Sequence, residues 1–130
     1  MHAPKPLTAT RVAATCAALD SASWPAGAIV LRTAPDEAIV LVPTKDIEPG
    51  LIADPHAIVE IESSLCGIWL DADDAHDLLE RECDWETPSA RPAFAQGAVA
   101  GLPVKLWFEH DRVLFVVSAV FANDFMERCR

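Results

Sequence analysis

Three short runs of apolar, mostly β-branched residues constrain the fold of this chain more than any other feature of its sequence. They read AIVLR (28–32), AIVLV (38–42) and VLFVVS (113–118). The second and third are apolar at successive positions, as strands covered on both faces are. The first two flank the segment TAPDE, so we expect a β-hairpin with a Pro-Asp turn. None of the runs is long enough to cross a bilayer.

The remaining segments predict helices placed around these strands. Further strands are expected at 56–63, 65–71 and 103–110, the first with one wet face or at a sheet edge. Helices are expected at 10–20, 72–82 and 119–129, with Ser118 capping the last. This order predicts an α+β fold, a mostly antiparallel sheet with helices packed on it. We expect residues 1–27 to form a lead-in with a short helix and residues 28–130 to form one α+β domain.

The segment LCGIWLDADDAHDLLERECDW (65–85) shows most clearly where a strand gives way to a helix. Asp71 is a natural N-cap, because its carboxylate can accept from an unpaired amide of the first turn. Ala75, Leu78 and Leu79 then follow the helical spacing of a buried stripe. Most of the carboxylates in this segment are therefore expected on the solvated side or at the start of a surface helix.

The charge and cysteine pattern excludes several classes of function. Ten basic residues against twenty acidic ones give a net charge of −10, which argues against nucleic acid and anionic membranes as partners. The cysteines at 16, 66, 83 and 129 form no C-x-x-C pair. The N-terminal segment MHAPKPLTAT has no apolar core, so we expect no signal peptide, reduced thiols and a cytoplasmic protein.

Each candidate residue for catalysis or metal binding has a simpler interpretation as part of the core or of the solvated surface. Asp73, His76 and Glu80 could share a helix face and hold a divalent ion, but a solvated acidic face is favoured. Cys66 and Cys83 lack the helix N-terminus or cationic neighbour that activates a thiol. The sequence also has no G-x-S-x-G motif and no phosphate-binding glycine loop. We therefore predict no catalytic residue and no metal site.

Two tryptophans are candidates for contacts with a partner or a ligand. Trp69 and Trp107 fall in predicted strands beside charged residues, where an indole can anchor a partner or stack on a ligand. Trp107 alternates with Lys105 and Glu109, so its face is expected to be exposed or contacted. Packing in the core is the alternative.

Three blocks of sequence resemble the gamma subunit of heterotetrameric sarcosine oxidase. They are VLRTAPDEAIVLVP (30–43), IVEIESSLCGIWLDADDAHDLLERECDWE (58–86) and FAQGAVAGLPVKLWFEHDRVLFVVSAVFANDFMERC (94–129). The last holds the family's Phe-x-x-Gly loop, here starting at Phe94, and its Ser-x-x-Phe-Ala helix start, here Ser118, Phe121 and Ala122.

The resemblance implies the folate-binding fold of the glycine-cleavage aminomethyltransferase (T-protein) and a non-catalytic accessory role in sarcosine and folate metabolism. It implies larger oxidase subunits as partners. Flavin, NAD and tetrahydrofolate would belong to those subunits, with none bound directly by this chain. Phe94, Trp69 and Trp107 are the partner-contact candidates.

Two other functions remain open from the sequence. The chain could be a stand-alone module for a tetrahydrofolate-like ligand, with Glu60, Glu62 or Asp84 pairing with the pterin edge. It could also be a structural protein that associates with itself, extending its sheet through 58–62 or 103–109.

Overall fold

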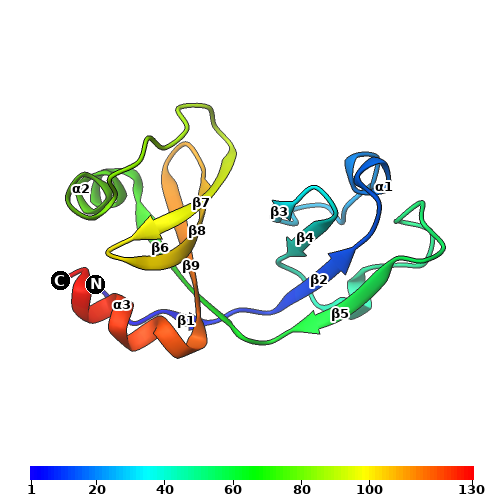
Figure 1. Cartoon of the computed structure of the whole chain (residues 1–130), viewed down its shortest axis with the longest axis horizontal. Helices are drawn as coiled ribbons and strands as arrows, with labels where there is room; N and C mark the ends of the chain where they lie inside the picture. The colour runs from blue at the N-terminus through cyan, green and yellow to red at the C-terminus, as the bar shows by residue number, and fades with distance from the viewer. The chain divides into compact units, whose positions relative to one another are not determined.

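The computed structural model describes residues 1–130, and its backbone contacts divide the chain into two compact units (Figure 1). Met1–Pro6 and Ser64–Arg130 form the first, which we call the five-strand unit, and Leu7–Ser63 form the second, the four-strand unit. No helix in the structure has both the length and the apolar character needed to span a bilayer.

The five-strand unit is built on an antiparallel sheet with the strand order β1-β6-β9-β8-β7. Its central strand β9 is the apolar run seen in the sequence, with Val113 to Val117 all buried. The hairpin between β7 and β8 turns at Ala100 and Gly101, both with positive φ, as the tightest hairpins require. The strands are β1 (Lys5–Pro6), β6 (Leu65–Asp71), β7 (Ala93–Val99), β8 (Leu102–Phe108) and β9 (Arg112–Ser118).

Two helices cover one face of this sheet (Figure 1). Helix α2 (Ala72–Glu82) contributes Ala75 and Leu78, and α3 (Ala122–Arg128), which follows the 3₁₀ turn η2 (Ala119–Phe121), contributes Phe125. The sheet contributes alternate residues from each strand, among them Ile68, Leu106 and Phe115. Phe115 and Phe125 meet with ring centroids 6.1 Å apart. Alternate side chains of the strands pack against the apolar stripes of the two helices, and together they form the core of the unit.

The four-strand unit contains a second antiparallel sheet, ordered β3-β4-β2-β5. Val12, Ala38 and Val40 from the sheet pack with Ala18 and Leu19 of the short helix α1. Thr10 is fully buried, and its hydroxyl donates to the Val42 carbonyl over 2.7 Å, which satisfies the buried group. The elements are β2 (Ala9–Ala13), α1 (Cys16–Asp20), β3 (Val30–Ala34), β4 (Glu37–Val40), the 3₁₀ turn η1 (Thr44–Asp46) and β5 (Ile58–Glu62).

The predicted α+β class, the hairpin at 28–42, and helix 72–82 are confirmed, as is the edge position of the strand within 56–63. The strands lie in two sheets, not one. The compact units also divide the chain elsewhere than at residue 27.

Three local expectations were wrong. The helix expected at 10–20 is a strand up to Ala13, and only Cys16–Asp20 is helical, because Ala9, Thr10 and Val12 are buried in the sheet and tertiary burial outweighs alanine's helix propensity. The Phe-x-x-Gly segment that starts at Phe94, expected as a loop, lies within β7 (Ala93–Val99). Ser118 stands at the start of the last helical segment, but its side chain makes no capping hydrogen bond.

Asp71 ends β6 and starts α2, and removing its side chain should weaken the five-strand unit. Its carboxylate accepts from the Asp74 amide over 2.9 Å, and its negative charge raises the pKa of Asp74 above the ordinary value. We expect Asp71→Ala to lower the free energy of unfolding by about 1 kcal/mol. Asp71→Asn keeps the acceptor and relieves the repulsion, so it should be close to neutral. Urea unfolding of the three proteins tests this, and equal losses in both variants would refute the capping role.

Candidate functional site

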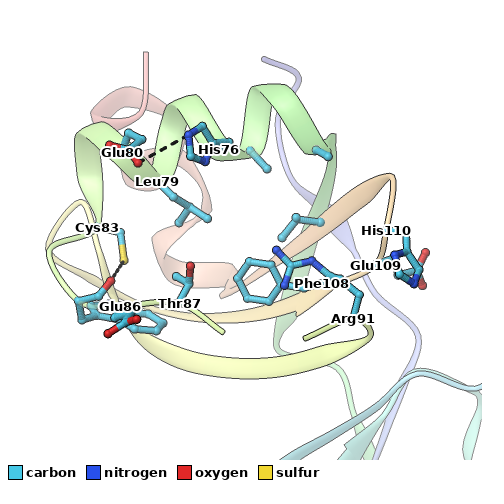
Figure 2. Close-up of a pocket in the computed structure, with 14 residues that line it drawn as sticks. His76, Leu79, Glu80, Cys83, Glu86, Thr87, Arg91, Phe108, Glu109 and His110 are labelled. Carbon is cyan, nitrogen blue, oxygen red and sulfur yellow. Dashed lines mark hydrogen bonds and ion pairs between the residues drawn. The ribbon is translucent and has the colours of Figure 1, made fainter. Parts of the chain in front are cut away.

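A cavity of about 370 Å³ opens in the five-strand unit at the end of the β8–β9 hairpin (Figure 2). Three segments line it: one side of α2, the loop that follows α2, and the residues on either side of the β8–β9 turn. Helix α2 lies above the cavity in Figure 2, with Leu79 pointing into it, and the loop and strands lie below. Its size falls at the lower end of ordinary small-molecule sites, about 300–1,000 Å³.

The floor of the cavity is apolar and firmly held. Phe108 is 2% exposed and Val113 is also buried, as is Ala75 of α2 on the opposite side of the cavity. Trp85 forms part of the wall, and its indole nitrogen donates to the Ala98 carbonyl over 2.7 Å. The indole lies directly over Gly97 of β7, where even a methyl group would come within 2.7 Å of the ring. Gly97 therefore makes room for Trp85.

Arg91 is the one cationic side chain in the lining that is charged at every ordinary pH. Its Cζ lies 4.6 Å from the centroid of the Phe108 ring, a cation–π contact. Its Nη1 donates to the carbonyls of Pro88 and Ala90, both over 2.8 Å. Arg91 is thus fixed in place by backbone and aromatic contacts and not by a carboxylate.

The rim of the cavity carries polar side chains from α2 and from the loop that follows it. His76 Nε2 lies 3.6 Å from Glu80 Oε1, and both are largely exposed. The Cys83 thiol donates to the Trp85 carbonyl over 3.4 Å, and Glu86 lines the same cavity. The exposed His76 and Glu80 agree with the solvated helix face expected from the sequence, and the Cys83 thiol is directed at a carbonyl and not at His76.

The other candidates for chemistry lie apart from this cavity. The structure gathers no three His, Cys, Asp or Glu side chains into an arrangement that could hold a metal ion. Cys66 and Cys129 are buried, and burial raises the pKa of the Cys129 thiol to about 11. Glu60, Glu62 and Asp84, the carboxylates considered for a pterin ring, are not among the residues that line it.

The three partner-contact candidates come together on the sheet face opposite α2 and α3. Phe94 lies opposite Trp107, Trp107 opposite Leu114, and Leu114 opposite Trp69. They form one row across β7, β8, β9 and β6, and all three candidates are half-buried. This row could not be read from the sequence, because alternation gives the face of each residue but not the register between strands.

Charged residues at the β8–β9 turn hold one end of this aromatic row. The Arg112 guanidinium lies 3.6 Å from the Trp69 ring centroid and donates to Glu109 over 2.8 Å. Trp107 donates its indole N–H to the other oxygen of Glu109 over 3.0 Å. The Arg112 hydrogen bond, with a smaller contribution from Trp107, holds the pKa of Glu109 below its ordinary value.

A separate apolar surface lies on β5 of the four-strand unit. Ile58, Val59 and Ile61 are 52%, 37% and 75% exposed. β5 is the last strand of its sheet and pairs only with β2, so its outer backbone groups form no ladder. An exposed apolar edge strand of this kind is a template for another strand.

Sequence reasoning missed Arg91 and Phe108. A signal for Arg91 was present, because the chain has no Asp or Glu between Glu86 and Glu109 although acidic residues are abundant elsewhere. An isolated arginine in that stretch has no carboxylate partner nearby in sequence. No comparable signal identifies Phe108, since only the fold brings it under Arg91.

Replacing Gly97 with alanine should displace Trp85 from the cavity wall. The new methyl group would meet three indole atoms at 2.7–2.9 Å, so the ring must move. We expect a loss of roughly 1–3 kcal/mol in unfolding free energy and a changed tryptophan emission spectrum. In a Trp85→Ala background, Gly97→Ala should cost much less. An equal cost in both backgrounds would show that the indole is not the obstacle.

The lowered pKa of Glu109 makes part of the stability dependent on pH. Because the folded-state pKa lies below the unfolded one, this contribution is present above the ordinary pKa of about 4.5 and is lost as pH falls through the folded value. We expect Glu109→Gln to cost roughly 1 kcal/mol at pH 7 and little at pH 3. Urea unfolding at the two pH values tests this. A cost that does not depend on pH would contradict it.

Comparison with known proteins shows a shared fold but no sequence family. No protein-family model matches the chain, and no curated protein is significantly similar to it. Among solved structures, it is similar to a chain of the heterotetrameric sarcosine oxidase from Corynebacterium sp. U-96, determined in complex with pyrrole 2-carboxylate. The TM-score is 0.75 at 17% identity, over 98% of this chain and 80% of that one. The chain therefore has the α+β fold of a chain from a heterotetrameric sarcosine oxidase.

Proposed function

We propose that this chain is a non-catalytic accessory subunit of a sarcosine-oxidase-like complex, in the role of the gamma subunit. The observation that carries the proposal is the structural likeness over 98% of the chain to one chain of a heterotetrameric sarcosine oxidase. The three blocks of sequence that resemble the gamma subunit support the same role. The chain would act in the cytoplasm, in sarcosine and folate metabolism.

Flavin, NAD and tetrahydrofolate would be held by the larger subunits. Two features of this chain support a role in assembly. The first is the aromatic row Phe94, Trp107 and Trp69, whose half-buried rings suit anchoring contacts. The second is β5, an edge strand of its sheet with exposed aliphatic side chains.

Co-purification tests the proposal directly. The tagged chain, expressed in its own organism, should bring down a larger polypeptide that has the visible absorbance of flavin and oxidises sarcosine. A chain that elutes alone, with all sarcosine oxidase activity in fractions that lack it, would overturn the proposal.

A matched pair of substitutions tests the β5 edge as the docking surface. Ile61 on β5 and Val120 on η2 are 75% and 81% exposed, so a lysine at either position should barely affect folding. We expect Ile61→Lys to weaken co-purification of the flavin-bearing partner at least about tenfold, since it places a charge in the buried interface. Val120→Lys should leave it unchanged. Quantitative pull-down measures both, and equal effects would exclude the edge.

A further inference from the structure

Arg91 differs from every other arginine of the chain. Each of the others forms an ion pair with a carboxylate, at distances from 2.8 to 3.7 Å. Arg91 has only the two carbonyls and the Phe108 ring. In a chain with twenty acidic residues and ten basic ones, an arginine that lines a cavity without a carboxylate partner is unusual.

We propose that the cavity binds a small organic monocarboxylate with an apolar body, and that Arg91 receives its carboxylate. This proposal does not rest on the subunit role. Both carbonyl bonds use Nη1, which leaves Nε and Nη2 without a hydrogen bond. These two nitrogens lie along one edge of the guanidinium, and such an edge pairs with both oxygens of a carboxylate.

The guanidinium is already positioned for such a ligand. The carbonyls of Pro88 and Ala90 fix Nη1, and the buried Phe108 ring supports the flat side of the group. Figure 2 shows Arg91 against Phe108, across the cavity from Leu79 of α2. A side chain that is held before the ligand arrives loses less entropy on binding.

The rest of the lining selects the ligand by shape and charge. Leu79, Phe108 and Val113 offer apolar surface to a ring or a short aliphatic body. Glu80, Glu86 and Glu109 also line the cavity, and they repel a second negative charge. A single carboxylate on an apolar body therefore fits, whereas phosphate and dicarboxylates are disfavoured.

Titration with benzoate tests the proposal, because benzoate is a flat monocarboxylate. Calorimetry should show saturable binding with a dissociation constant on the order of 1 mM, as expected for so small a ligand. The indole N–H signal of Trp85, in the cavity wall, should shift in the NMR spectrum. Benzamide, which has the same shape without the charge, and phthalate, with two charges, should each bind at least about tenfold more weakly.

Variants of the full chain separate this role from a structural one. Arg91→Lys keeps a cation but loses the planar fork, and it should weaken benzoate binding about tenfold. Arg81→Lys is the matched control, since Arg81 is paired with Glu82 and does not line the cavity; it should bind as the unaltered chain does. Leu79→Trp narrows the cavity from the α2 side and should also weaken benzoate binding at least about tenfold, which keeps the test valid if Arg91→Lys fails to fold.

The competing explanation is that Arg91 only covers Phe108. It predicts that benzoate and benzamide bind equally or not at all, and that Arg91→Lys changes stability without changing affinity. Either result overturns the proposed site. Neither result bears on the proposed subunit role, which is tested separately by co-purification.

Discussion

The burial of β9 on both faces is the constraint on which the five-strand unit depends. Val113, Phe115 and Val117 face the helices, while Leu114 and Val116 are buried on the opposite face. A strand of this kind has room for polar groups only at its ends. The charged residues Glu109 and Arg112 accordingly stand at the β8–β9 turn, and the cavity opens beside that turn. The cavity and the ion pair between Glu109 and Arg112 therefore lie where the core of this unit ends.

The sequence predicted those parts of the fold in which local preference and burial agree. The β-branched runs became strands, and Asp71 became the cap of α2. The sequence-based prediction was wrong where small residues have little preference for strand, helix or loop. Ala93 to Val99 contain alanine and glycine, which are poor strand formers, yet pairing with β8 and the packing of Trp85 on Gly97 make this segment β7.

The cavity could not be predicted from the sequence, for a different reason. Its parts come from α2, the loop after it and the β8–β9 hairpin, and only the tertiary fold brings them together. The aromatic row was predictable only in part, because alternation placed Trp107 on an exposed or contacted strand face but could not align it with Trp69 and Phe94. Register is set by long-range pairing, and no local pattern encodes it here.

The sequence of β5 bears on whether its edge serves a second copy or a different partner. Ile58, Glu60 and Glu62 alternate with Val59 and Ile61 along the strand. If two copies paired antiparallel about Glu60 or about Ile61, glutamates would stand opposite one another, and like charges in cross-strand pairs are destabilising. A partner strand with a basic residue opposite Glu60 avoids this cost. These two self-pairing registers are therefore disfavoured, whereas a register centred on Val59 places Glu60 opposite Ile58 and no glutamates opposite one another.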